Sequence, residues 1–284
     1  PARRRRGMTD TVDALLAEGR ALGLDPGAVR ALLAQRLDRS PTWLLAHGRE
    51  PISPEAFTSC RDGLVQLAAG APLGQLLGVV DFARLTLRVT EATLLPRPDT
   101  EVLLEGLLRR LPSGPLRVLD LGTGSGALAL ALKAARPELT VFASDISPDA
   151  LAVAEENARR LGLAVTFFES DWYEALPSSL FPMDAILANP PYIAPGDPEL
   201  SPSVARFEPA LALFAKDQGF DALERVLTGA RSRLRPRGWL GLEHGHRQAV
   251  TLAARLQRAG YDELALERDT GDRPRATFAR QPHG

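Results

Sequence analysis

The spacing of apolar side chains changes character along the chain. Up to about residue 75, apolar positions recur every three or four residues, as in Val12, Leu15 and Leu16 and again in Val29 and Leu32. This period is typical of amphipathic helices. Three helix-start signals, each a capping side chain followed by proline, divide the region: Asp25-Pro26, Ser40-Pro41 and Ser53-Pro54. We therefore expect a small all-α domain of four or five short helices over residues 8–75.

The next segment, residues 76–96, alternates apolar and polar positions. Phe82, Leu85 and Leu87 are separated by residues that suit a solvent-facing side. Alternation of this kind predicts a β-hairpin, which would link the helical domain to the rest of the chain. A helix is then expected to run to about residue 111, with Asp99 or Thr100 as its capping side chain.

From residue 97 to residue 284 the pattern predicts an α/β domain. Short apolar runs at 117–120, 140–145, 165–170 and 183–188 alternate with helical segments, which is typical of a doubly wound parallel sheet with helices on both faces. Further strands are expected at 239–243, 264–268 and 276–279, with helices at 220–234 and 248–259. The proline-rich connection at 193–216 has a length usually found over active sites.

Composition narrows the class of protein. The 34 basic and 35 acidic residues nearly cancel, so no net field would hold the chain to nucleic acid. The single cysteine, Cys60, excludes an internal disulfide framework and fits a reducing compartment. No apolar stretch approaches the ~18 residues of a membrane helix, and no signal peptide follows the basic start. We expect a cytoplasmic protein with no membrane partner, and residues 1–7 to be a disordered arm or extension before Met8.

A glycine turn follows the strand at 117–120. Its glycines would let a ligand approach the backbone closely. Gly122, Gly124 and Ala127 match a dinucleotide-binding turn, whereas Gly122, Gly124 and Gly126 match a loop that binds S-adenosylmethionine. Asp145, at the end of the next strand, can accept hydrogen bonds from the ribose hydroxyls of either cofactor. This part of the sequence leaves both cofactors open.

Trp172 follows the third strand of the predicted sheet. Because the carboxyl ends of parallel strands face one crevice, its indole face is placed to lie against an adenine ring. A role in closing the core is the alternative for this residue.

The residues that directly follow the strand at 183–188 are the candidates for binding a reacting group: Asn189, Pro190, Pro191 and Tyr192. The Asn189 side-chain oxygen and the Pro190 carbonyl can accept the two N–H bonds of a planar NH2 group, such as that of glutamine or adenine. The prolines would fix these acceptors, and Tyr192 would stack on the flat group. A positively charged methyl donor suits this arrangement, whereas hydride transfer needs no paired acceptors.

The chain resembles the PrmC/HemK family, the glutamine methyltransferases of peptide release factors. The resemblance extends from Met8 to the end of the chain. It is carried by these segments: 95–101 (LPRPDTE), 120–126 (DLGTGSG), 189–192 (NPPY), 207–211 (FEPAL) and 242–245 (LEHG) with Gln248. Phe207 departs from the pattern, which commonly has tyrosine there.

The resemblance implies a class I methyltransferase fold, Rossmann-like. Our own hypothesis is that the helical domain and the linker recognise the substrate, because a short target tripeptide offers little surface for selectivity. It implies methyl transfer from S-adenosylmethionine, leaving S-adenosylhomocysteine, to the side-chain N5 of the glutamine in the Gly-Gly-Gln motif of class I release factors. The implied cofactor residues are Gly122, Thr123, Gly124, Ser125, Gly126, Asp145, Trp172 and Asn189. The implied glutamine-binding residues are Asn189, Pro190, Pro191 and Tyr192, of which Asn189, Pro190 and Tyr192 are the catalytic set. Arg97, Thr100 and Glu208 would lie near the site, in roles that the sequence does not define.

Other functions remain open at this level. A glutamine methyltransferase of a ribosomal protein would share the catalytic core, and an adenine amino-methyltransferase would share the tetrapeptide at 189–192. The near-zero net charge opposes an adenine amino-methyltransferase, which would need basic residues to bind phosphates. We therefore expect no direct nucleic-acid binding. A nicotinamide-dependent oxidoreductase leaves the tetrapeptide unexplained. His244 and His246, with one glutamate, make a poor metal site, so no metal is expected.

Overall fold

A computed structural model describes residues 10–283, so the expected arm at 1–7 and Met8 lie outside the described residues. The chain divides between Gly78 and Val79 into two compact units. Within the described residues, no helix is both long and apolar enough to cross a membrane.

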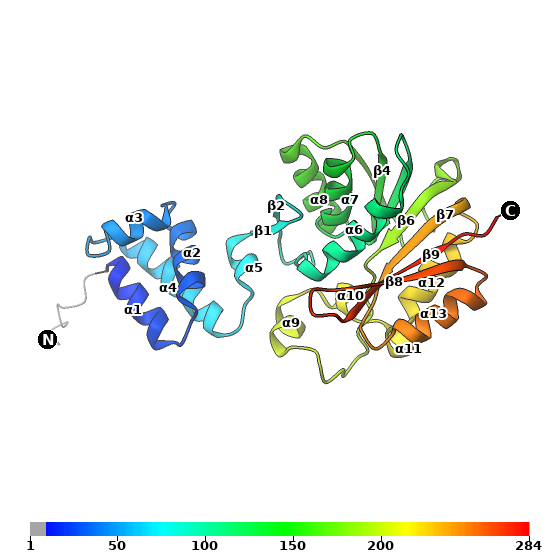
Figure 1. Ribbon diagram of the computed structural model, residues 1–284. Helices are drawn as coiled ribbons and strands as arrows, with labels where there is room; N and C mark the ends of the chain where they lie inside the picture. The colour runs from blue at the N-terminus through cyan, green and yellow to red at the C-terminus, as the bar shows by residue number, and fades with distance from the viewer. Residues whose placement is uncertain (1–9, 284) are drawn as a thin grey trace, which may run out of the picture. The chain divides into compact units, whose positions relative to one another are not determined.

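The first unit is entirely helical (Figure 1). Its helices are α1 (Val12–Ala21), α2 (Pro26–Arg36), α3 (Pro41–Ala46), α4 (Pro54–Ala68) and α5 (Leu73–Leu77). The side chains of Asp25, Ser40 and Ser53 accept hydrogen bonds from backbone N–H groups in the first turns of α2, α3 and α4. The three predicted start signals are thus confirmed. Cys60 and Leu32 are fully buried in the apolar core of this unit.

The second unit begins with the antiparallel pair β1 (Val79–Phe82) and β2 (Leu85–Arg88), as the alternating pattern predicted. A 3-10 turn, η1 (Pro98–Thr100), leads into α6 (Glu101–Arg110). Thr100 occupies the N-cap position, yet its side chain makes no capping hydrogen bond. The prediction of Asp99 or Thr100 as the cap is therefore confirmed for the position of Thr100, but not for a capping side chain, because the Thr100 hydroxyl contacts the side chain of Asn189 instead.

A seven-stranded sheet in the order β5-β4-β3-β6-β7-β9-β8 forms the centre of the second unit. The strands are β3 (Arg117–Leu121), β4 (Thr140–Asp145), β5 (Val165–Glu169), β6 (Met183–Ala188), β7 (Leu234–Glu243), β8 (Asp262–Arg268) and β9 (Pro274–Arg280). The first five in spatial order are parallel, and β9 runs antiparallel to β7 and β8. The predicted doubly wound α/β fold is confirmed.

Helices cover both faces of this sheet (Figure 1). One core contains side chains of α6, α7 (Ala127–Ala135) and α8 (Pro148–Leu161). The opposite core contains side chains of α12 (Asp221–Ala230) and α13 (Ala249–Arg258). Strand order reverses between β3 and β6, which opens a crevice at their carboxyl ends.

The connection after β6 is not a plain loop. It contains the short helices α9 (Pro202–Phe207), α10 (Ala210–Leu213) and α11 (Lys216–Gly219). A further 3-10 turn, η2 (Ser178–Leu180), precedes β6.

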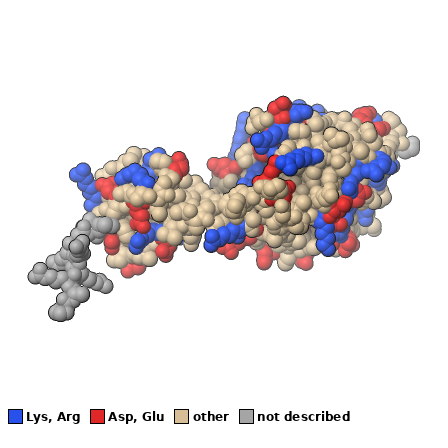
Figure 2. Space-filling view, turned by 90° about the horizontal axis from the view of Figure 1, so that it is seen from below, with Lys and Arg blue, Asp and Glu red and all other residues tan. Residues whose placement is uncertain are grey.

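Figure 2 shows basic and acidic side chains interspersed on the visible face of each unit.

Candidate functional site

A cavity of about 550 Å³ opens at the carboxyl ends of the parallel strands. The structure brings eight of the predicted site residues to its wall: Gly122, Thr123, Gly124, Ser125, Asp145, Trp172, Asn189 and Pro191. Gly126, Pro190 and Tyr192 do not line it. The connection after β6 contributes Leu211 and Phe214, among others, as its length predicted.

The glycine turn has the backbone conformation that only glycine adopts without strain. Gly122, Gly124 and Gly126 all have positive φ, at 69°, 56° and 84°. A Cβ added to Gly126 would lie 3.0 Å from Leu130 Cδ1 and 3.2 Å from Ala154 Cβ, so Gly126 serves helix packing. A Cβ added to Gly124 would meet no atom within 4 Å. Gly124 therefore leaves open space beside the backbone where a ligand can lie.

Asp145 ties the glycine turn to the end of β4. Its Oδ2 accepts the Gly124 N–H at 2.8 Å, and its Oδ1 accepts the Ser147 N–H at 2.9 Å. Burial raises the pKa of Asp145, while these backbone donors act in the opposite direction. The carboxylate fixes the turn and also faces the cavity, where it can accept further hydrogen bonds.

Asp120 is a buried carboxylate to which the sequence pattern assigned no role. It is 1% exposed, lines the cavity, and accepts the Thr123 hydroxyl on Oδ2 at 2.6 Å. Its Oδ1 is buried without a hydrogen-bond partner, and burial raises its pKa to about 7. A ligand with a donor group would satisfy this oxygen. The signal was available, because Asp120 lies near the end of a buried strand as Asp145 does.

Trp172 forms part of the cavity wall beside the glycine turn. Its φ is +52°, which is rare for a bulky side chain, and such strain is common at functional sites. Its ring lies 3.6 Å from where a Cβ of Gly122 would be. The indole thus packs over the start of the turn, and its contact with an adenine stays a prediction.

Asn189 follows β6, whose six residues are all buried. The Asn189 side-chain nitrogen donates to the Thr100 hydroxyl at 3.3 Å. With the amide turned this way, the side-chain oxygen is left to accept other donors. Thr100 is 4% exposed and lines the cavity, so it lies near the site as expected, although the sequence did not reveal this contact.

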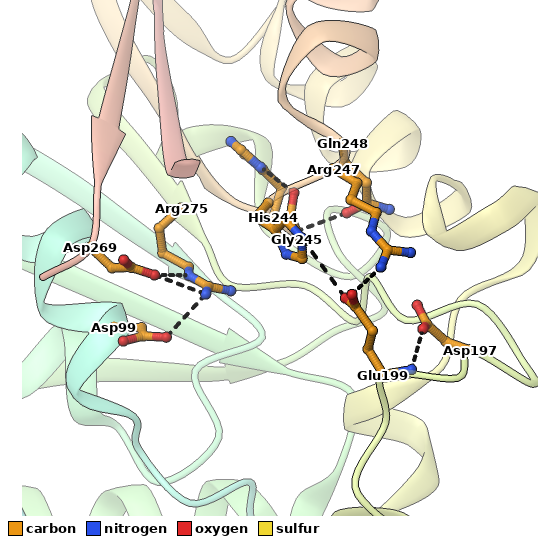
Figure 3. Close-up of polar contacts among 10 residues, drawn as sticks. Asp99, Asp197, Glu199, His244, Gly245, Arg247, Gln248, Asp269 and Arg275 are labelled. Atoms are coloured by element: carbon orange, nitrogen blue, oxygen red, sulfur yellow. Dashed lines mark hydrogen bonds and ion pairs between the residues drawn. The ribbon is translucent and has the colours of Figure 1, made fainter. Parts of the chain in front are cut away.

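Tyr192 is held from two sides. Its hydroxyl donates to Glu243 Oε1 at 3.2 Å, and its carbonyl accepts from Gln248 Nε2 at 3.1 Å. Gln248 also accepts the Gly245 N–H at 2.9 Å (Figure 3). Gln248 therefore connects residue 192 to the turn after β7. The ring packs against the core on the α12 and α13 side. Its stacking on a substrate stays a prediction.

Glu243 is a second buried carboxylate that the sequence pattern did not single out. It ends β7, is 2% exposed, and leaves Oε2 buried without a hydrogen-bond partner. Burial raises its pKa to about 7, while the Thr100 hydroxyl, the nearby Arg275 and Tyr192 lower it. Arg275 is itself paired with Asp99 at 3.1 Å and Asp269 at 3.0 Å (Figure 3).

Arg97 and Glu208 meet at the wall of the cavity. Arg97 lines the cavity and forms an ion pair with Glu208, whose side chain is 1% exposed. Glu208 also accepts the Leu95 N–H at 3.4 Å. This contact joins the segment before α6 to the connection after β6.

The two histidines do not form a metal site. His244 is fully buried, with Nδ1 at 2.9 Å from the Gly245 carbonyl and Nε2 at 2.8 Å from Thr277 Oγ1. Burial lowers its pKa, so it is neutral. His246 lies 3.8 Å from Glu199. Among residues 10–283, no cluster of three or more histidine, cysteine, aspartate or glutamate side chains could hold a metal ion.

Family models match both units of the chain. Residues 14–78 match the PrmC N-terminal domain, and residues 98–207 match the methyltransferase small domain. These two matches fall on the helical unit and on the part of the sheet that carries the glycine turn and Asn189.

Curated relatives match nearly the whole chain. The release factor glutamine methyltransferase of Xylella fastidiosa is 44% identical over 254 residues, which cover 89% of this chain and 92% of the relative. The protein of the same name from Escherichia coli is 41% identical over 250 residues, covering 88% and 90%.

A solved structure shows the same fold. The T. thermophilus 16S rRNA methyltransferase RsmC, solved in complex with AdoMet and guanosine, is 20% identical and superposes with a TM-score of 0.54. The match covers 72% of this chain and 49% of that one. At this identity the likeness supports the methyltransferase fold alone.

Proposed function

The chain belongs to the release factor glutamine methyltransferase family, and from this premise we propose that it methylates the side-chain N5 of the glutamine in the Gly-Gly-Gln motif of class I peptide release factors. The observation that carries the proposal is the hydrogen bond from Asn189 to Thr100, which uses the side-chain nitrogen and leaves the Asn189 side-chain oxygen to accept from a donor such as an amide NH2. We further propose that S-adenosylmethionine is the methyl donor.

The residues that line the cavity fit this cofactor. The buried and unpartnered Asp120 Oδ1 is an acceptor for an ammonium group, and Asp145 can accept from ribose hydroxyls. Gly124 leaves room for close approach to the backbone, and Trp172 offers a flat apolar face. Gly122, Thr123 and Ser125 complete the wall on this side, while Gly126 acts through packing.

When bound, S-adenosylmethionine would supply a methyl group on a positively charged sulfur. The glutamine nitrogen would gain the methyl, the electron pair of the broken C–S bond would stay on sulfur, and one amide proton would leave to water. An amide nitrogen is a poor nucleophile, because its lone pair is delocalised. The Asn189 oxygen and the Pro190 carbonyl would each accept one N–H of the glutamine, which orients the lone pair and stabilises the charge that develops on nitrogen.

The rigid backbone at 189–192 supports this role. Pro190 and Pro191 fix two φ angles, and Pro190 is buried, so its carbonyl has little freedom to move. Tyr192 is anchored at its hydroxyl by Glu243 and at its carbonyl by Gln248. The acceptors are therefore in place before the substrate arrives, which lowers the reorganisation needed in the reaction.

The helical unit is proposed to bind the release factor outside its target tripeptide. A Gly-Gly-Gln sequence offers little surface from which selectivity could come. We propose no nucleic-acid partner, because basic and acidic side chains are interspersed on the visible surface. A cytoplasmic location follows from a substrate that acts in translation and agrees with a free, buried Cys60.

Radiolabelled S-adenosylmethionine offers the direct test. The protein is incubated with a release factor, with the glutamine-to-alanine variant of its Gly-Gly-Gln motif, with a ribosomal protein fraction, and with adenine-rich DNA. We expect label on the native release factor alone. Equal label on the glutamine variant, or preferential label on ribosomal protein or DNA, would refute the proposal.

A further inference from the structure

The chain adopts a left-handed conformation immediately before α12. Asp217 and Gln218 have φ/ψ angles of 50°/51° and 53°/34°, and Gly219 follows with a φ of 87°. Successive left-handed residues are rare, because the Cβ of every residue except glycine then crowds the following carbonyl oxygen. Such a conformation persists only where the surrounding structure enforces it, and it is common at functional sites. We call residues 217–219 the left-handed turn.

Contacts on both sides hold the left-handed turn. Arg255 of α13 donates from Nη2 to Asp217 Oδ2 at 3.0 Å, and the Phe220 N–H donates to the Asp217 carbonyl at 3.0 Å. Just before the turn, Ala215 lines the cavity and donates its N–H to the Ile193 carbonyl at 2.9 Å. The turn is therefore connected to α13 and also to the segment that follows the tetrapeptide at 189–192.

The left-handed turn lies directly against the main chain of Tyr192. A Cβ added to Gly219 would lie 2.1 Å from the Tyr192 carbonyl oxygen and 2.7 Å from Gln248 Nε2, so only glycine fits. Gln248 Nε2 donates to the Tyr192 carbonyl at 3.1 Å and to the Gln218 carbonyl at 3.4 Å. Its Oε1 accepts the Gly245 N–H at 2.9 Å (Figure 3). One side chain thus joins the segments after β6, before α12 and after β7.

We propose that the left-handed turn and Gln248 form a clamp on the Tyr192 carbonyl, and that Gln248 is a positioning residue for the acceptors at 189–192. The inference rests on the proposed function, since it concerns how the same acceptors keep their place. Pro190 and Pro191 fix two φ angles, so a shift of the main chain at residue 192 reaches the Pro190 carbonyl with little loss. Gln248 is not among the described residues that line the cavity, so it acts through the backbone.

Two glycines with the same backbone conformation provide the first test. Gly219 and Gly196 have φ angles of 87° and 83°, but a Cβ added to Gly196 would meet no atom of the described residues within 4 Å. Alanine causes similar backbone strain at both positions, and only Gly219→Ala displaces the Tyr192 carbonyl. Gly219→Ala should lower kcat for release factor methylation by about 10- to 100-fold, whereas Gly196→Ala stays near the native value.

The side chain of Gln248 is tested by a change that keeps its shape. Gln248→Glu can still accept the Gly245 N–H but has no N–H group for the Tyr192 and Gln218 carbonyls. We expect kcat to fall by about 10- to 100-fold at little changed cofactor affinity, measured by calorimetry. Gln257→Glu makes the same chemical change at an exposed position of α13 and should leave kcat near the native value. Equal kcat values for the two variants overturn the inference.

The conformation of the turn is tested at Gln218, whose side chain is exposed. Glycine adopts the left-handed conformation freely, whereas a β-branched residue resists it. Gln218→Val should therefore lower kcat by about 10-fold relative to Gln218→Gly. If Gly219→Ala does not fold, this pair and the Gln248 variant decide. Equal kcat for Gln218→Val and Gln218→Gly would show that turnover does not depend on the left-handed turn.

A further readout does not depend on activity. The chain has three tyrosines, so labelling their carbonyl carbons with 13C gives three NMR signals, and Tyr192→Phe assigns that of residue 192. Gln248→Glu should shift the Tyr192 signal and leave those of Tyr173 and Tyr261 in place, whereas a generally loosened core would shift all three. An unmoved Tyr192 signal overturns the inference.

The two proposals can fail separately. If the native protein labels no release factor, the proposed function fails, and the carbonyl signal still decides whether Gln248 holds residue 192. If the native protein labels the release factor but Gly219→Ala and Gln248→Glu turn over at the native rate, the inference alone fails.

Discussion

Arg97 and Glu208, 111 positions apart in the chain, form an ion pair in which the Glu208 side chain is almost completely buried and the Arg97 side chain is 40% exposed. Arg97→Ala would leave the Glu208 carboxylate buried with the Leu95 N–H as a weak donor. We expect the free energy of unfolding in urea to fall by about 1–3 kcal/mol, because a buried charge loses its main partner.

The matched control for this loss is the exposed pair of Arg49 and Asp13, 3.9 Å apart, in which the Arg49 side chain is 97% exposed. Arg49→Ala should change the unfolding free energy by less than about 0.5 kcal/mol. Equal losses of unfolding free energy for the two substitutions would show that the ion pair of Arg97 with Glu208 stabilises the fold no more than an exposed pair does.

Gly124 and Gly162 form a matched pair for testing the cofactor site. Both have positive φ, at 56° and 65°, and neither has an atom within 4 Å of an added Cβ. Alanine at either position should cost about 1–2 kcal/mol of stability. Gly162 ends α8, whereas Gly124 lines the cavity. Calorimetry should therefore show weaker S-adenosylmethionine binding for Gly124→Ala and unchanged binding for Gly162→Ala; the same affinity in both would remove Gly124 from the site.

Asp120 should lower the free energy of unfolding at neutral pH, although we propose that it binds the cofactor. Its folded pKa of about 7 lies above the ordinary value of 3.8, so the folded state binds the extra proton between these values. The stability of the free protein therefore falls as pH rises through this window. Asp120→Asn removes the effect and should be more stable than the native protein at about pH 8, on the order of 1–4 kcal/mol, with a smaller difference at about pH 5.

Asp120→Asn should also bind S-adenosylmethionine less tightly, since a neutral amide replaces the carboxylate that we propose as the acceptor for the ammonium group. Urea unfolding at both pH values and calorimetry measure the two effects. A variant that binds normally would show that Asp120 does not contact the cofactor.

Asn189→Ala should nearly abolish turnover, with kcat about 100- to 1000-fold lower, because a fixed acceptor for the substrate N–H is lost. Cofactor binding should weaken only modestly, since the glycine turn and Asp145 remain. Radiolabel transfer and calorimetry distinguish the two effects. Turnover at the native rate would contradict the role given to Asn189.

Removing the helical unit, residues 1–78, should impair methylation of a full-length release factor far more than methylation of a short Gly-Gly-Gln peptide. The physical reason is that the lost surface contacts only the larger substrate. The ratio of kcat/KM for the two substrates is the measurement, and circular dichroism confirms that the remaining unit is folded. An unchanged ratio would exclude the proposed recognition role.

Local signals in the sequence were sufficient for much of the fold. Proline preceded by a capping side chain gave the starts of α2, α3 and α4, and short apolar runs gave the parallel strands. The expected start of β7 at residue 239 was five residues late, since Arg235-Pro236-Arg237-Gly238 reads as a turn. In the structure this stretch lies within β7, and the register between β6 and β7 shifts there, between the pairs Met183–Leu234 and Ala185–Trp239.

The site was predictable where it depends on strand ends and not where it depends on pairing between distant segments. Asp145 ends a strand, Asn189 directly follows one, and both line the cavity. Thr100 could not be assigned, because its partner Asn189 is 89 positions away. Glu243 also ends a strand, but its link to the site is its hydrogen bond with Tyr192. That contact depends on the register of β7 against β6, which the sequence pattern does not give.

The cavity takes residues from the ends of β3, β4, β5 and β6, and Glu243 of β7 accepts a hydrogen bond from Tyr192 in the segment after β6. A growing polypeptide that has emerged only as far as β5 contains the glycine turn but lacks Asn189 and its support. We therefore expect the completely folded second unit to bind the ligand and an early folding intermediate not to bind it. Because a ligand that binds only the native state shifts the equilibrium by mass action, the urea midpoint should rise steadily with ligand concentration. Occupancy of the cavity is thus coupled to complete folding of the second unit.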